Sequence, residues 1–164
     1  AKPQTAPPKK AVPVRRVRML LEACELERRL ASGGYAEIRE QEAPQLGMWL
    51  TVEHVLPQKW GAHWGVDPEL PEEVRHELEA EREAHVHRLG NLTLATKKLN
   101  PSVGNAAWAK KREGLDKHSI LHLNRDLVQK HPASWSEPDI DARSAELAAL
   151  IAKHWPGPEA WSEI

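Results

Sequence analysis

Between residues 14 and 30, apolar side chains recur every three or four positions, the period of one face of an α-helix. The pattern ends at Ser32, which two glycines follow. We therefore expect a helix over residues 14–30. The positions that carry the pattern are Val17, Leu20, Leu21, Ala23 or Cys24, and Leu26.

Two short segments have the composition of β-strands. Residues 49–56 are rich in β-branched and apolar side chains and end at Pro57, and residues 89–95 alternate in polarity. Three further segments, residues 105–113, 120–130 and 140–154, have helical patterns. The sequence therefore predicts an α+β fold that is predominantly α-helical and contains two short antiparallel strands.

A further helix is expected between the two strands. Pro71 precedes Glu72 and Glu73, and proline and carboxylates are favoured in the first turn of a helix. Gly90 is a suitable end, so we predict a helix over residues 71–86. This helix would separate the strands by an insertion.

Length and composition limit the class of protein. With 164 residues we expect one domain over residues 15–155, a proline-rich basic arm over residues 1–14 and a tail over residues 156–164. Apolar runs are too short for a membrane span, and the single cysteine excludes an internal disulfide. We expect a cytoplasmic protein without membrane contact. Because the chain does not begin with Met, we also expect it to be part of a longer protein.

Charge occurs in blocks although the net charge is only −1. Residues 67–83 carry eight carboxylates and two arginines, whereas residues 84–112 carry six basic side chains and no carboxylate. For the acidic block, a solvated helix face with no binding role is as good an explanation as a functional surface. The basic block favours contact with nucleic acid.

Glu53 and His54 are adjacent at the end of the first predicted strand. In a regular strand they point to opposite sides, so a hard carboxylate ligand and a titratable imidazole can perform different tasks. The pair alone is a weak signal. It gains weight from the Val-Leu-Pro-Gln that follows it, from Gly90-Asn91-Leu-Thr-Leu, and from Asn100.

With these residues in place, the sequence resembles the HNH, or ββα-metal, nucleases, and within them the C-terminal nuclease domain of GmrSD-type restriction enzymes. The resemblance runs from about residue 50 to residue 111 and implies a ββα-metal core over about residues 50–113. It continues more weakly at Trp135, Ile140, Arg143 and Trp155.

The resemblance implies a role for each motif residue. His54 would be the general base, and Asn91 would fix the loop that presents it. Glu53 and Asn100 would bind one Mg²⁺ or Mn²⁺ ion, whose preference for oxygen ligands suits a carboxylate and an amide. Because Pro101 follows Asn100 and puts a helical setting for that residue in question, Asn105 is the substitute candidate for this ligand.

The same resemblance implies a metal-dependent endonuclease that nicks or cuts double-stranded DNA in a prokaryotic restriction or anti-phage defence protein. An upstream domain that hydrolyses nucleoside triphosphate would control it. Basic residues beyond the second strand would contact the phosphate backbone, which gives affinity without sequence choice. They are Lys97, Lys98, Lys110, Lys111 and Arg112.

Several alternatives remain open from the sequence. The fold could serve as a catalytically silent module for DNA binding or protein docking, or the chain could be a helical interaction module in which Glu53-His54 is accidental. The pairs His85–His87 and His118–His122 also allow a zinc site. We expect Trp108, Trp135 and Trp155 in the core, and Trp60 and Trp64 at the surface.

Overall fold

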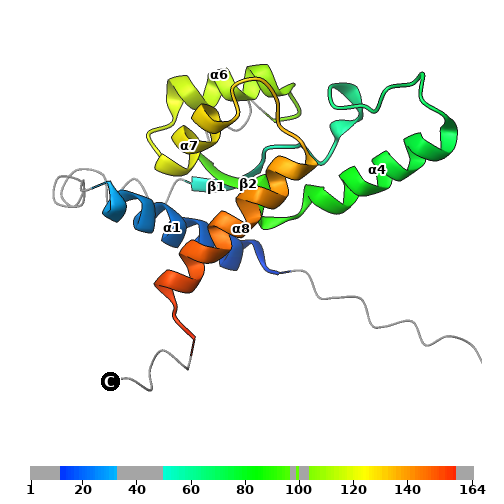
Figure 1. Ribbon diagram of the computed structural model, residues 1–164. Helices are drawn as coiled ribbons and strands as arrows, with labels where there is room; N and C mark the ends of the chain where they lie inside the picture. The colour runs from blue at the N-terminus through cyan, green and yellow to red at the C-terminus, as the bar shows by residue number, and fades with distance from the viewer. Residues whose placement is uncertain (1–11, 33–49, 97–98, 100–103, 158–164) are drawn as a thin grey trace, which may run out of the picture.

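The computed structural model describes residues 12–32, 50–96, 99 and 104–157. These residues form five α-helices, two short 3₁₀ helices and a two-stranded sheet. In Figure 1, α6 and α7 lie on one side of the strands, and α1 and α8 lie on the other. The predicted fold class, α+β and predominantly helical, is therefore confirmed.

The sheet is a hairpin with a long connection. Strand β1 (Leu50–His54) pairs antiparallel with β2 (Leu92–Thr96), and His54 lies opposite Leu92. The connection holds the 3₁₀ helix η1 (Trp60–Ala62), helix α4 (Glu72–Val86) and the 3₁₀ helix η2 (Leu89–Asn91). The predicted insertion of a helix between the strands is confirmed, and α4 projects from the rest of the molecule (Figure 1).

The other helices are α1 (Val14–Ala31), α6 (Trp108–His118), α7 (His122–Lys130) and α8 (Glu137–His154). Several boundaries differ from the prediction: α6 and β2 each begin three residues later than predicted, at Trp108 and Leu92. Helix α6 continues past Glu113 because Leu115 is buried in the core. Helix α8 begins three residues earlier because Ser136 and Asp139 form a capping box at its start.

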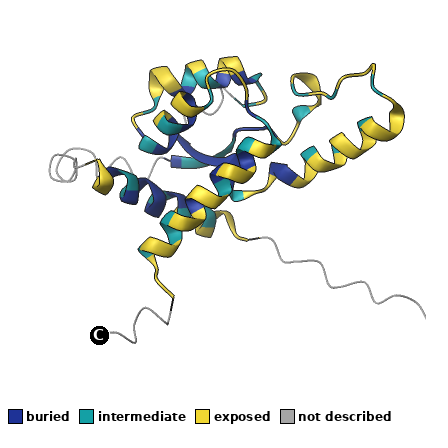
Figure 2. Cartoon of the chain, viewed as in Figure 1, coloured by how far each residue is buried: buried dark blue, intermediate teal, exposed yellow. Residues whose placement is uncertain are grey.

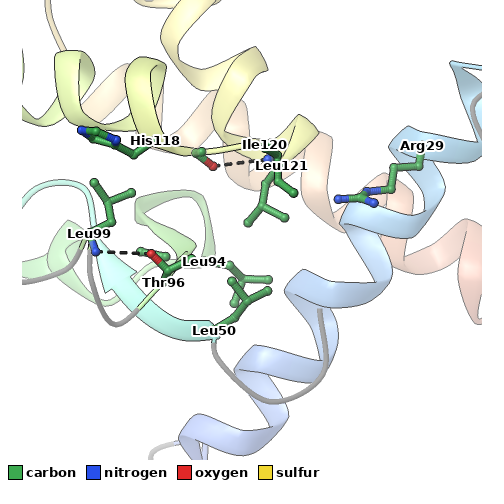
Figure 3. Close-up of a pocket in the computed structure, with 10 residues that line it drawn as sticks. Arg29, Leu50, Leu94, Thr96, Leu99, His118, Ile120 and Leu121 are labelled. Carbon is green, nitrogen blue, oxygen red and sulfur yellow. Dashed lines mark hydrogen bonds between the residues drawn. The ribbon is translucent and has the colours of Figure 1, made fainter. Parts of the chain in front are cut away.

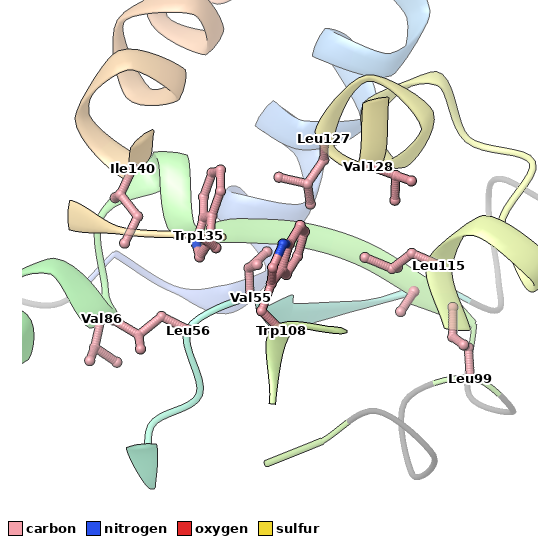
Figure 4. Close-up of a cluster of buried hydrophobic side chains, with 11 residues drawn as sticks. Val55, Leu56, Val86, Leu99, Trp108, Leu115, Leu127, Val128, Trp135 and Ile140 are labelled. Carbon is pink, nitrogen blue, oxygen red and sulfur yellow. The ribbon is translucent and has the colours of Figure 1, made fainter. Parts of the chain in front are cut away.

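Two apolar clusters pack against the hairpin. Strand β2 is buried at four of its five residues, whereas β1 is buried only at Leu50 (Figure 2). One cluster joins Leu50, Leu92 and Leu94 to α1, α7 and α8. The other contains Trp108 and Trp135, whose ring centroids are 5.9 Å apart (Figure 4).

The expectations for the tryptophans are only partly correct. Trp108 and Trp135 are core residues, as predicted. Trp155 is 44 % exposed because it follows the end of α8, so its predicted place in the core is wrong. Trp60 and Trp64 are partly buried against the cluster of Trp108, and therefore are not free surface residues.

Helix α8 holds the segment between α4 and β2. The buried Arg143 donates hydrogen bonds to the carbonyl oxygens of Gly90 (2.5 Å) and Leu92 (2.8 Å). The Gly90 N–H donates to Ser144 Oγ at 2.9 Å. These bonds fix the backbone on both sides of Asn91 against α8.

The close approach of η2 to α8 requires glycine at position 90, since a Cβ there would overlap the carbonyl oxygen of Ile140 and the backbone of Ser144. We expect Gly90→Ala to lower the free energy of unfolding by about 2 kcal/mol or more, because neither backbone can move freely. Gly61→Ala is the matched control, since nothing lies within 4 Å of a Cβ at that position. Urea denaturation measures both variants, and equal stabilities would contradict the packing described here.

Candidate active site

A polar pocket of about 240 Å³ lies where β1 ends. Glu53 and His54 form one wall, and the turn that contains Gly104 and Asn105 forms another. The structure therefore brings three of the predicted site residues, Glu53, His54 and Asn105, to one place. The remaining wall is Pro57, Gln58 and Lys59.

Asn91 is completely buried and does not line this pocket. Its Oδ1 accepts hydrogen bonds from the backbone N–H of Leu56 (2.7 Å) and from Trp135 Nε1 (3.1 Å). Its Nδ2 donates to the carbonyl oxygens of Leu56 and Val86, both at 2.8 Å. An amide can make four such bonds, so Asn91 is saturated and its side chain fixes the chain just after His54.

Lys111 occupies an unexpected position. It was predicted to contact DNA, but it is only 1 % exposed. Its Nζ lies 3.0 Å from Glu53 Oε1 and donates to the carbonyl oxygen of His54 at 2.6 Å. The prediction for Lys111 is therefore corrected, since this ammonium group joins α6 to β1 inside the protein.

The other predicted DNA-contacting residues fall into two groups. Lys110 is exposed and Arg112 is partly exposed, so both are accessible on α6. Lys97 and Lys98 lie outside the described residues, as does the predicted metal ligand Asn100. Helix α6 therefore directs Lys110 and Arg112 toward the surface and Lys111 toward the interior.

Burial controls the electrostatics of the pocket. Burial raises the pKa of Glu53 and lowers that of Lys111, and in each case the charged partner opposes the shift. Burial also lowers the pKa of His54 to about 4, with smaller contributions from the neighbouring His87 and Lys111. The His54 imidazole is therefore neutral at physiological pH.

His87 is a site residue whose role the sequence did not indicate. It follows α4, is exposed, and places Nδ1 3.2 Å from His54 Nε2. The two rings meet edge to face, with centroids 5.2 Å apart. His87 is 33 positions from His54, so only its place in the hairpin connection could have suggested the contact.

The alternative of a zinc site at His85 and His87 finds no support, because the two side chains do not converge on one point. His85 Nδ1 lies 2.6 Å from the Glu81 carbonyl oxygen, and its Nε2 faces Asp141 at 3.2 Å. Within the described ranges, no group of three or more His, Cys, Asp or Glu side chains is arranged to hold a metal ion. The oxygen donors of Glu53 and Asn105 instead suit a hard ion that keeps several waters.

A second pocket, of about 130 Å³, shares no residue with the first. Its lining is mostly apolar and lies between the strands and the start of α7 (Figure 3). It contains none of the residues expected to act in catalysis. The polar pocket at Glu53 and His54 is therefore the candidate active site.

The family assignment agrees with this geometry. A family model described as "GmrSD restriction endonucleases, C-terminal domain" matches residues 12–150. The chain belongs to this family. Membership in the GmrSD family supports a nuclease-type role in restriction, with DNA as the substrate.

Two other comparisons add no relative, since no curated protein and no solved structure matches the chain. Among the described residues, no helix is both long and apolar enough to cross a membrane.

The Lys111–Glu53 pair provides a test of the site's architecture. We expect Lys111→Met to lower the free energy of unfolding by about 3 kcal/mol, because it leaves the largely buried Glu53 carboxylate without its cation. The double variant Lys111→Met/Glu53→Met should lose less than the sum of the two single variants. Urea denaturation of all three proteins gives the coupling free energy.

Lys110→Met is the control for this cycle, since Lys110 is the exposed neighbour on the same helix. It should change stability by less than about 0.5 kcal/mol. Additive losses for Lys111 and Glu53 would show that the two side chains do not interact in solution.

Proposed function

We propose that this GmrSD-family domain is a metal-dependent DNA endonuclease of the HNH type. The observation that carries the proposal is the buried Asn91 side chain, which holds the segment after His54 so that His54 and Glu53 line one pocket with Asn105. A general base and oxygen ligands for a hard metal are thereby available to one scissile phosphate. In this proposal the domain nicks or cuts DNA as the effector of a larger prokaryotic restriction or anti-phage defence protein.

His54 acts as the general base. Hydrolysis of a phosphodiester requires a water molecule that loses a proton as it attacks phosphorus. The neutral imidazole of His54 can accept that proton, and burial keeps it neutral. Lys111 donates to the His54 carbonyl oxygen and so holds the backbone from which the ring projects.

Glu53 and an asparagine amide hold one Mg²⁺ or Mn²⁺ ion. Asn105 lines the same pocket as Glu53, which favours it as the amide ligand, while Asn100 lies outside the described residues. When bound, such an ion neutralises phosphate charge and stabilises the leaving 3′ oxygen. Lys111 contacts only Oε1 of Glu53 and keeps the carboxylate oriented.

Double-stranded DNA would reach this pocket along the exposed cations beside it. Lys110 and Arg112 are accessible on α6, Lys59 lines the pocket, and Lys97 and Lys98 belong to the same basic run. Contacts from these residues to phosphate oxygens supply affinity without base preference. An NTP-hydrolysing domain of the same protein would control access, and the family resemblance is the support for that part of the proposal.

Removal of the base is the first test. We expect His54→Ala to reduce the rate of plasmid nicking by about 10²-fold or more at saturating Mg²⁺, with DNA affinity nearly unchanged, because a general base acts mainly in the transition state. His76→Ala, an exposed histidine on α4, should cut at the wild-type rate. EDTA should stop cleavage in both the wild type and the control.

Two results would count against the proposed activity. Plasmid that stays intact with Mg²⁺ and with Mn²⁺, although DNA binds, would indicate the silent binding module instead. Cleavage by His54→Ala at the wild-type rate would remove His54 from the mechanism.

The metal ligands are tested by binding rather than by cleavage. Titration with Mn²⁺, followed by the loss of its free electron paramagnetic resonance signal, should show weaker binding by Glu53→Gln and by Asn105→Ala, each by about tenfold. Gln129→Ala removes an exposed amide from α7 and should bind Mn²⁺ like the wild type. If Asn105→Ala binds Mn²⁺ with unchanged affinity and Asn100→Ala binds it more weakly, Asn100 rather than Asn105 is the amide ligand.

A further inference from the structure

The two imidazoles at the end of β1 can share a single proton. His54 Nε2 and His87 Nδ1 are 3.2 Å apart, and a hydrogen bond between neutral rings needs one protonated and one unprotonated nitrogen. Either His54 donates from Nε2, or His87 donates from Nδ1. The two arrangements leave different nitrogens of His54 available to the pocket.

We propose that His87 is a positioning residue that accepts a hydrogen bond from His54 Nε2–H and thereby leaves His54 Nδ1 unprotonated as the basic nitrogen. The catalytic part of this inference rests on the proposed function, because it assigns the atom of His54 that would accept the proton. The arrangement of the two rings is a property of the folded protein alone.

The preferred tautomers favour this direction. Free neutral histidine carries its proton mainly on Nε2, and the bond from His54 Nε2–H to His87 Nδ1 keeps both rings in that form. The reverse bond would require the less favoured Nδ1–H form in both rings. It would also occupy the lone pair of His54 Nε2 while Nδ1 is protonated, so that His54 could not accept a proton at all.

The backbone around both rings is fixed by one side chain. Asn91 bonds Leu56, two residues after His54, and its Nδ2 also donates to the carbonyl oxygen of Val86, which directly precedes His87. Leu56 and Val86 are both almost completely buried. The core therefore holds the backbone segments that carry the two imidazoles close to each other.

The direct test is the tautomer of His54. Long-range ¹H–¹⁵N correlation spectra of the full chain, recorded where both rings are neutral, distinguish a protonated Nε2 from a protonated Nδ1. We expect the Nε2–H form of His54 in the wild type. We expect a tautomer mixture in His87→Ala, which should fold normally because His87 is exposed. A protonated Nδ1 in the wild type, or an unchanged spectrum in His87→Ala, would overturn the inference.

A second substitution at position 87 distinguishes the positioning of His54 from a general effect of removing the His87 side chain. In His87→Asn the amide oxygen can take the place of Nδ1 as the acceptor. We therefore expect His87→Ala to cut DNA about tenfold more slowly at unchanged DNA affinity, and His87→Asn to recover most of that loss. Equal defects in Ala and Asn variants, or a defect confined to DNA affinity, would overturn the positioning role.

The two readouts keep this inference distinct from the proposed function. If the wild type cuts no DNA but His54 has the Nε2–H form only when His87 is present, the nuclease proposal fails and the arrangement of the rings stands. If the wild type cuts DNA but the tautomer of His54 is the same in the wild type and in His87→Ala, the nuclease proposal stands and this inference fails.

Discussion

The amide of Asn91 is the interaction on which the site depends. Its four hydrogen bonds join the segment after β1, the end of α4 and the core tryptophan Trp135. A buried amide that lost any of these partners would retain an unsatisfied polar group, at a cost of about 1–3 kcal/mol. The positions of three segments that are distant in sequence are therefore coupled through one side chain.

The Lys111–Glu53 pair adds a second constraint at the same place. A carboxylate that is only 13 % exposed would lose its charge readily if no cation compensated it. Lys111 keeps Glu53 in a form that can bind a cation and also holds the His54 carbonyl oxygen. Helix α6 thus contributes to the site through one inward residue, whereas its neighbours Lys110 and Arg112 remain accessible.

Local sequence pattern was enough to predict the five described α-helices and both strands, because hydrophobic periodicity and the effects of proline and glycine extend over only a few residues. The two 3₁₀ helices were not predicted, and residues 89–91, which form η2, belong to the second predicted strand. The motif also indicated Glu53, His54 and Asn91 as neighbours in space. It could not indicate that Lys111 is buried, since charge along a sequence does not reveal which face of a helix meets the core. The contact of His87 with His54 was not predicted because it depends on the path of the 36 residues between His54 and Asn91.

The long connection inside the hairpin has a consequence for the order of folding. Strand β1 can pair with β2 only after the whole connection that contains α4 has been made. Closing so long a loop is slower than forming a short hairpin. The backbone around Asn91 is completed only by Trp135 and Arg143, from the last third of the chain. During synthesis the pocket therefore cannot assume its final geometry until nearly the entire domain has left the ribosome. A partly made chain therefore lacks the hydrogen bonds that fix the backbone around Asn91.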